Sequence, residues 1–314
     1  MASQEGYVEV LGHNLFYRIF GEPRKGTILC LHGGPGATHD YLLPLADLAW
    51  GGYRVVFYDQ LGCGRSELPK DRGLLVVEHY TDEVEELRKT LRLGRIHLIG
   101  SSWGGQLAIS YALKYQGSLM SLVTVGGYHN VLMMFEEMQR MKRELPPEIY
   151  RTLRRYEEMG DYENQEYLRG VTAFYRKHLC TLKEWPLEVQ YSLDHTSKLV
   201  YETMNGPNEF TIIGNTRYWD ASDRLGGIKV PTLILGGEYD EVSPAVARDM
   251  HRRIRGSKLV IFRRSSHMPF WEERKEFMKV VLTFISNAVA QAGNHSHIPS
   301  RSRRGKLKAE KATN

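Results

Sequence analysis

The feature that most constrains the fold is the segment at residues 96–115, IHLIGSSWGGQLAISYALKY, in which an apolar β-type run passes directly into a helical pattern. A strand that becomes a helix within a few residues must turn sharply, and the turn crowds the backbone around the serine between Gly100 and Gly104. We therefore expect a strand, a tight turn and a helix, with both glycines required for steric reasons. Ser102 would then lie at the helix N-terminus, where developing negative charge is stabilised.

Short apolar runs and helical patterns alternate through residues 1–127, which predicts right-handed crossovers and a mostly parallel sheet. Residues 128–220 instead carry long helical patterns rich in Met, Glu, Arg and Tyr. Strand-type runs return in VPTLILGGEYD and KLVIFRRSSH, before a final helical pattern. The sequence thus predicts an α/β core made of residues 1–127 and 221–290, interrupted once by a helical insertion at 128–220.

The charge of the chain is concentrated at one end. Residues 301–314, RSRRGKLKAEKATN, hold six Lys/Arg against one Glu, which is +5 and equals the net charge of all 314 residues. We therefore interpret residues 291–314 as a disordered basic tail on a neutral domain, and we expect no nucleic-acid partner. The N-terminus lacks a basic segment followed by an apolar one, and no run approaches the ~20 apolar residues of a membrane span, so we expect a cytoplasmic protein that does not bind membranes.

The cysteines Cys30, Cys63 and Cys180 are widely separated and form no CxxC pair. Free thiols are expected, in place of a disulfide or a metal site.

Residues 100–104 fit the pattern G-x-S-x-G between a strand and a helix, which predicts Ser102 as a nucleophile. Ser101 occupies the variable position of the motif, where its side chain should point elsewhere. A nucleotide-binding turn is disfavoured because neither G-x-G-x-x-G nor G-K-[ST] is present. A serine hydroxyl is a weak nucleophile, so Ser102 needs a base, and the base needs an acid that orients it.

The acid and the base are predicted at Asp240 and His267, which come later in the sequence. Asp240 follows the apolar run TLILGG, and His267 follows KLVIF. Both would lie at carboxyl ends of parallel strands, on the same edge of the sheet as Ser102, and the order Ser, Asp, His suits such a sheet. Most of the other eleven histidines lie in helical patterns, in the insertion or near the termini, where a surface role is the default expectation. No metal or cofactor is required, because His267 activates the serine.

The glycine-rich stretch LHGGPG at residues 31–36 follows an apolar run. Glycines let the backbone approach a substrate closely, so the N–H groups of Gly34 and Trp103 are predicted to bind the oxyanion of a tetrahedral intermediate. We expect His32 to brace the glycine loop by hydrogen bonding and not to act as a second base.

Taken together, these stretches resemble the proline iminopeptidases, which are serine aminopeptidases of the α/β-hydrolase fold, and among them the tricorn-interacting aminopeptidase of archaea. The resemblance spans residues 7–288 and depends on HGGPG, FYDQLGCGRS, GSSWGG, MNGPNEF and GEYDEVSP followed by SSH. The turn around Ser102, residues 100–105, reads GSSWGG in this chain, where many members of the family have GGSWGS.

The resemblance implies an α/β-hydrolase fold, with a mostly parallel sheet flanked by helices and residues 128–220 as a cap over the site. It also implies that Glu209 and Glu241 bind the free amino group of a short peptide, and that the chain has a functional link to a larger peptide-producing protease. Two carboxylates suit this task, because the ammonium of an N-terminal proline has two N–H donors. Glu238, in the same acidic stretch as Glu241, is expected to be solvated.

We therefore expect a serine exopeptidase that releases an N-terminal residue, preferentially proline, through an acyl-enzyme. An amidase acting on prolinamide would use the same residues, whereas a carboxylesterase would not need the two glutamates. An epoxide hydrolase or dehalogenase would require Asp at position 102, and an inactive receptor would be expected to lack a triad residue. The strictness of the proline preference stays open. A set of aromatic residues of the insertion either walls an apolar subsite or forms the core of the cap: Tyr162, Tyr167, Phe174, Tyr175 and Trp185.

Overall fold

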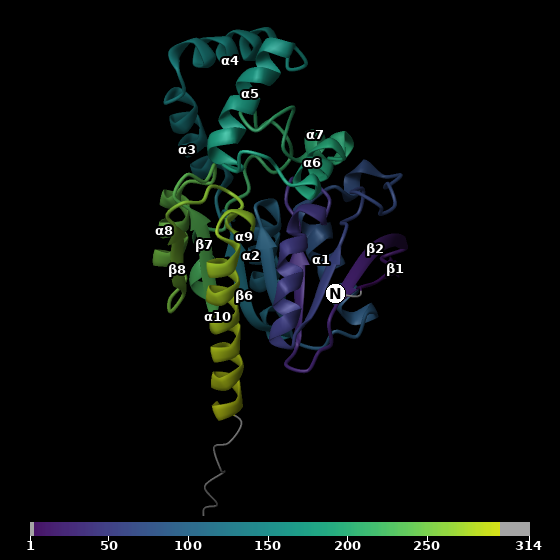
Figure 1. Cartoon of the computed structure of the whole chain (residues 1–314). Coiled ribbons are helices and arrows are strands. Elements are labelled where there is room, and N and C mark those ends of the chain that lie inside the picture. The colour runs from purple at the N-terminus through teal and green to yellow at the C-terminus, as the bar shows by residue number, and fades with distance from the viewer. Residues whose placement is uncertain (1–2, 296–314) are drawn as a thin grey trace, which may run out of the picture.

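The computed structural model describes residues 3–295, which form one sheet flanked by helices, with a group of helices above it (Figure 1). The strands are β1 (Ser3–Val10), β2 (His13–Phe20), β3 (Thr27–Leu31), β4 (Arg54–Tyr58), β5 (Ile96–Ser101), β6 (Leu119–Val125), β7 (Thr232–Gly237) and β8 (Lys258–Phe262). The α-helices are α1 (Val77–Thr90), α2 (Trp103–Tyr115), α3 (Val131–Arg143), α4 (Pro147–Met159), α5 (Gln165–His178), α6 (Leu187–Asp194), α7 (Lys198–Met204), α8 (Pro244–Arg253), α9 (Pro269–Glu272) and α10 (Arg274–His295).

The strand order is β1-β2-β4-β3-β5-β6-β7-β8. The six strands β3 to β8 run parallel to one another, whereas β2 is antiparallel to both of its neighbours, β1 and β4. The predicted mostly parallel sheet is therefore confirmed. The β1–β2 hairpin at its edge is an addition to the predicted strands.

The central strands are buried on both faces, which explains their continuous apolar runs. In β3, Ile28 and Cys30 face a cluster that contains the 3₁₀ helix at Asp40–Gly51 and α10. Leu29 and Leu31 face the opposite cluster, to which α1, α2 and α8 contribute. Successive residues of a strand point to opposite faces, so one strand serves both layers of helices.

Helices α3–α7 form an insertion between β6 and β7, which we call the cap; α3, α4 and α5 rise above the sheet in Figure 1. Its two ends are joined, because the N–H of Val131 donates to the carbonyl of Trp219 (3.1 Å) and the N–H of Ala221 to that of His129 (2.8 Å). The upper helices have a hydrophobic cluster of their own. The upper cap helices thus have a core of their own, whereas α6 and α7 pack on the α/β core: Val189 and Val200 belong to the two clusters that flank the sheet.

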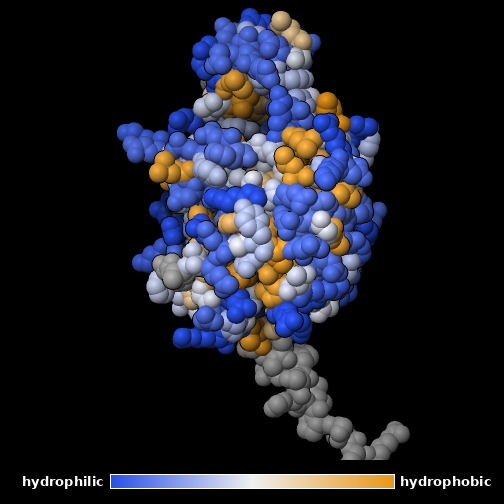
Figure 2. All heavy atoms as spheres, turned by 90° about the vertical axis from the view of Figure 1, so that its right-hand side faces the viewer, coloured by the Kyte–Doolittle hydropathy of each residue, from blue (hydrophilic) through white to orange (hydrophobic). Residues whose placement is uncertain are grey.

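Helix α10 continues through residues 291–295, and the rest of the predicted basic tail, residues 296–314, lies outside the described residues. Cys30, Cys63 and Cys180 are free and buried, as expected. Between residues 3 and 295, no helix is both long enough and apolar enough to cross a membrane. Figure 2 shows a mostly polar face, with apolar groups gathered in the hollow below the upper lobe.

Candidate active site

The turn between β5 and α2 places Ser102 in a strained conformation, with φ 58° and ψ −124°. A Cβ on Gly100 would lie 2.0 Å from the carbonyl oxygen of Gly104, and one on Gly104 would lie 2.2 Å from that of Leu31. Both glycines are therefore steric requirements of the turn. Ser102 lines a cavity whose walls come from the core and the cap, whereas Ser101 does not line this cavity and has 1% of its surface exposed.

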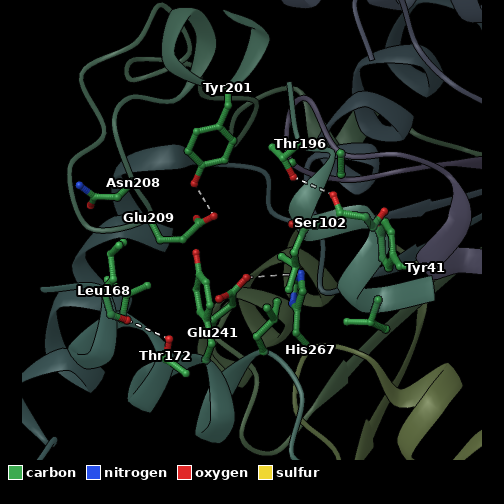
Figure 3. A pocket seen from close by; sticks show the side chains of 18 of the residues that line it. Tyr41, Ser102, Leu168, Thr172, Thr196, Tyr201, Asn208, Glu209, Glu241 and His267 are labelled. Carbon is green, nitrogen blue, oxygen red and sulfur yellow. Dashed lines mark hydrogen bonds and ion pairs between the residues drawn. The ribbon is translucent and has the colours of Figure 1, made fainter. Parts of the chain in front are cut away.

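The structure brings the three predicted triad residues together at one edge of the sheet. Nδ1 of His267 donates to Oδ1 of Asp240 (2.6 Å), which also accepts the N–H of Val242 (2.8 Å). The proton on Nδ1 leaves Nε2 as the nitrogen available to a substrate. His267 and Ser102 line the same cavity and lie next to each other in it (Figure 3).

The predicted oxyanion donors come from two segments, the start of α2 directly after Ser102 and the loop after β3. Trp103 is the first residue of α2, so its N–H has no acceptor within the helix. Gly34 follows β3 with φ 109° and lines the cavity. Two N–H groups in this arrangement can receive the negative charge that develops on a carbonyl oxygen attacked by Ser102.

The two carboxylates expected at the substrate amine, Glu209 and Glu241, lie in the same cavity. Glu209 comes from the loop after α7 and accepts a hydrogen bond from the hydroxyl of Tyr201. Glu241 follows Asp240, and its Oε1 lies 3.7 Å from Nε2 of His267. Both carboxylates point into one space beside Ser102 (Figure 3), so the geometry offers a site for a cation next to the nucleophile.

The electrostatics of this space favour a cation. Burial raises the pKa of Glu241 to about 8, although the positive charge of His267 lowers it; the negative charges of Glu209 and Asp240 raise it further. Burial also raises the pKa of Glu209. Burial alone would lower the pKa of His267, but the carboxylates around it outweigh burial and raise this pKa to about 9. Three tyrosines near the carboxylates stay neutral because burial raises their pKa: Tyr128, Tyr175 and Tyr201.

The cavity has a volume of about 430 Å³ and a wall formed largely by the cap. The sequence did not decide whether five aromatic residues of the cap wall a subsite or form its core. Four of them line the cavity: Tyr162, Tyr167, Tyr175 and Trp185. Phe174 instead packs in the core of the cap, 4.9 Å from Phe210 between ring centroids. Phe174 thus serves the cap core alone, whereas Tyr167 serves both roles, since it lines the cavity and also belongs to the cap cluster.

Comparison with known proteins places this site in a family. The model of the alpha/beta hydrolase fold matches residues 26–274. A proline iminopeptidase of Saccharolobus solfataricus is 47% identical over 90% of this chain and 92% of its own length, and one of Thermoplasma volcanium is 44% identical over 91% and 98%. The chain belongs to the proline iminopeptidase family of α/β hydrolases. The crystal structure of the proline iminopeptidase of Mycobacterium smegmatis superposes with a TM-score of 0.86 at 30% identity, covering 92% of this chain and 100% of that one.

Beneath the oxyanion donors lies a buried network that the sequence predicted only in part. Nδ1 of His32 donates to the carbonyl of Gly33 (3.0 Å), and its Nε2 accepts the N–H of Gln60 (3.0 Å). The side chain of Gln60 in turn donates to the carbonyl of His32 (2.9 Å) and accepts from Nε1 of Trp103 (2.9 Å). Burial lowers the pKa of His32 to about 4, so this imidazole stays neutral and acts as the expected brace. The role of Gln60 was missed, although it lies in the FYDQLGCGRS stretch.

The sequence also missed the contact between the cap and the triad. The carbonyl oxygen of His178, the last residue of α5, accepts the N–H groups of Glu241 (3.1 Å) and His267 (3.2 Å). Nδ1 of the His178 imidazole donates to the carbonyl of Tyr239 (2.8 Å). Nothing in the local sequence signals this role, because His178 ends an ordinary amphipathic helix.

A metal site is a separate matter. In the described part of the chain, no group of three or more His, Cys, Asp or Glu side chains is arranged to hold a metal ion.

Proposed function

We propose that this member of the family is a serine aminopeptidase that releases an N-terminal residue, preferentially proline, from short peptides. The observation that carries the proposal is the convergence of Glu209 and Glu241 on the space beside Ser102. A general esterase has no use for two buried carboxylates at that position, because burying them is costly unless a cation pairs with them. The names of the archaeal relatives support the same activity.

The reaction begins when the substrate ammonium binds between Glu209 and Glu241 and brings the first peptide carbonyl to Ser102. The hydroxyl oxygen of Ser102 attacks the carbonyl carbon while Nε2 of His267 takes its proton. Asp240 holds the imidazole and stabilises the imidazolium that forms. The N–H groups of Gly34 and Trp103 bind the oxyanion, a contribution worth about 100- to 1,000-fold in rate for each donor.

The tetrahedral intermediate then collapses. The C–N bond breaks, the imidazolium of His267 donates its proton to the leaving amine, and the first residue stays esterified to Ser102. Water attacks the ester as His267 removes its proton, and the second collapse returns that proton to Ser102. The products are the free N-terminal residue and the shortened peptide.

The same geometry explains why cleavage would be limited to one residue. An amine anchored beside the nucleophile leaves room for a single residue before the scissile carbonyl. The ring of proline suits a cavity with aromatic walls, and its secondary ammonium has one N–H for each carboxylate. The cytoplasmic location and the link to a larger protease stay predictions from the sequence.

The proposal is tested with a prolyl arylamide, its N-acetylated form and a simple acyl ester. We expect the free amine to be cleaved far faster than the acetylated form, because a charge-assisted hydrogen bond contributes about 1.5–3 kcal/mol, or about 10- to 100-fold. Equal rates on the free and blocked substrates would refute the amine anchor.

The variant Glu209→Gln locates the anchor. It should lose activity on the prolyl arylamide to a greater extent than on the ester, whereas Glu238→Gln, at an exposed position of the acidic stretch, should match the wild type on both. Equal losses on both substrates for Glu209→Gln would assign this residue a structural role. Activity retained by Ser102→Ala would refute the mechanism.

A further inference from the structure

Glu241 contacts the catalytic base at its reactive nitrogen. Its Oε1 lies 3.7 Å from Nε2 of His267, and the two side chains are 6% and 3% exposed. Within the part of the chain that the structure describes, Nε2 of His267 and Oε2 of Glu241 are buried without a hydrogen-bond partner. The nitrogen that must receive the proton of Ser102 therefore faces a carboxylate at ion-pair distance.

We propose that Glu241 holds His267 as an inactive imidazolium in the free enzyme, and that the substrate ammonium releases the base by taking the place of the imidazolium beside Glu241. A protonated imidazole has no lone pair on Nε2, so it cannot accept the proton of Ser102. The inference rests on the proposed function, because it requires the substrate amine to bind at Glu209 and Glu241. It adds a second role to Glu241, which would control the base as well as bind the substrate.

The charged groups around His267 support this arrangement. Asp240 pairs with Nδ1, Glu241 faces Nε2, and Glu209 approaches from the cap. From α5, the imidazole of His178 is engaged with a carbonyl oxygen and its pKa is lowered by burial, so it adds no positive charge. The nearby phenols are neutral because burial raises their pKa: Tyr41, Tyr128, Tyr175 and Tyr201.

No lysine or arginine is among the described residues that line the cavity. In the free enzyme, the imidazolium of His267 is consequently the cation that these carboxylates share. This geometry agrees with the raised pKa of His267, to which the charges of Asp240, Glu241 and Glu209 contribute after burial has lowered it.

The exchange of cations balances in charge and in protons. The ammonium enters the space between Glu209 and Glu241 with one positive charge, and the imidazolium loses its Nε2 proton to water. The neutral Nε2 then accepts the proton of Ser102. A substrate without an amine leaves the imidazolium in place, so it encounters a protonated base as well as an unfilled anchor.

The first test uses p-nitrophenyl acetate, an ester without an amine, and measures kcat/KM against pH. The wild type should gain activity only at a pH above the ordinary range of histidine. In Glu241→Gln, the rising limb should move to lower pH by about 1 to 3 units, the usual effect of removing an opposite charge at this distance. Below that range, the variant should hydrolyse the ester about tenfold faster than the wild type for each unit of the shift.

The same variant should lose activity on the prolyl arylamide, which needs the anchor. Glu238→Gln, the matched change at an exposed glutamate of the same loop, should keep the wild-type profile on both substrates. An unshifted ester profile for Glu241→Gln, or a loss at every pH, would overturn the inference. The ester profile does not depend on amine binding, so failure of the proposed peptidase activity would be seen separately, with the prolyl arylamide.

A second test needs no variant and therefore does not depend on how Glu241→Gln folds. Pyrrolidinium chloride supplies the secondary ammonium of proline without a scissile bond, and sodium chloride at equal ionic strength is the control. At pH 7, pyrrolidinium should accelerate hydrolysis of the acetate ester by the wild type, with saturation, and should move the rising limb to lower pH. A profile that pyrrolidinium does not shift, or inhibition at every pH, would overturn the inference.

Discussion

Replacing His178 with alanine should uncouple the cap from the triad. The main-chain carbonyl of His178 accepts the N–H groups of Glu241 and His267. Its imidazole is held by the carbonyl of Tyr239 at 2.8 Å and by the ring of Phe174, with 4.6 Å between centroids. The alanine variant keeps the carbonyl but removes the side chain that fixes its position. The change therefore tests positioning without deleting either bond to the catalytic loops.

The size of the effect follows from these contacts. Leaving the part-buried carbonyl of Tyr239 unpaired costs about 1–3 kcal/mol, and the lost ring contact with Phe174 adds about 0.5–1.5 kcal/mol. We expect the free energy of unfolding to fall by roughly 2–4 kcal/mol, which a domain with about 5–15 kcal/mol of stability can survive. A displacement of the catalytic groups by about 1 Å costs on the order of 100-fold in rate, so kcat should fall by about 10- to 100-fold.

The assay measures the urea midpoint, and kcat on a prolyl arylamide and on an ester, each normalised to active sites titrated by the acyl-enzyme burst. The control is His195→Ala at the residue directly after α6, where an exposed imidazole makes the same kind of bond to the carbonyl of Tyr191 (2.9 Å). The control should change stability and kcat little. If His178→Ala kept the wild-type kcat per active site, the reasoning would be refuted whatever the loss of stability, because the cap would then not position the triad.

Three further changes test the scaffold. Gly100→Ala should prevent formation of an active fold, because its Cβ would lie 2.0 Å from a backbone oxygen, whereas Gly117→Ala meets nothing within 4 Å; a wild-type melting temperature for the first variant would contradict the steric account. Trp103→Phe keeps the oxyanion N–H but removes the hydrogen bond from Nε1 to Gln60. The variant should lose about 1–3 kcal/mol of stability and have a lower kcat on the ester. An unchanged kcat would show that the hydrogen bond to Gln60 is not needed for catalysis. Burial lowers the pKa of His97 from 6.5 to about 4, so the unfolded chain binds the extra proton and stability should fall by up to about 3 kcal/mol as pH drops from 6.5 to 4. His97→Asn should show a shallower fall in the urea midpoint, and equal slopes would exclude this histidine as a cause.

The triad could be predicted from the sequence because a parallel sheet converts chain order into position. Ser102 and Asp240 each follow a buried apolar strand, and His267 follows the apolar, partly buried edge strand β8; carboxyl ends of parallel strands meet at one edge of the sheet. The β1–β2 hairpin gave a weaker signal, since most of the side chains in β1 are exposed or only partly buried. A strand at the edge of a sheet needs no continuous apolar run.

Roles that depend on packing between distant segments could not be predicted. His178 meets its acceptor 61 residues further along the chain, and no local pattern encodes such a contact. The local sequence also does not show which aromatic residues of the cap face its core and which face the cavity. Phe174 and Tyr175 are adjacent in α5, so the period of the helix turns their side chains about 100° apart, one into the cap core and the other into the cavity.

The acidic stretch at residues 237–244 joins catalysis to recognition through a single imidazole. Asp240 holds one nitrogen of His267 and Glu241 faces the other, whereas Glu238 is exposed, as expected. Two buried carboxyl groups beside one histidine keep their negative charge only if a cation accompanies them; the imidazolium supplies it in the free enzyme and the substrate ammonium in the complex. A substrate that brings its own cation frees the base, and a neutral substrate does not. The preference for a free amino terminus should therefore increase as the pH falls below the pKa of His267, because a larger fraction of the free enzyme then carries a protonated base.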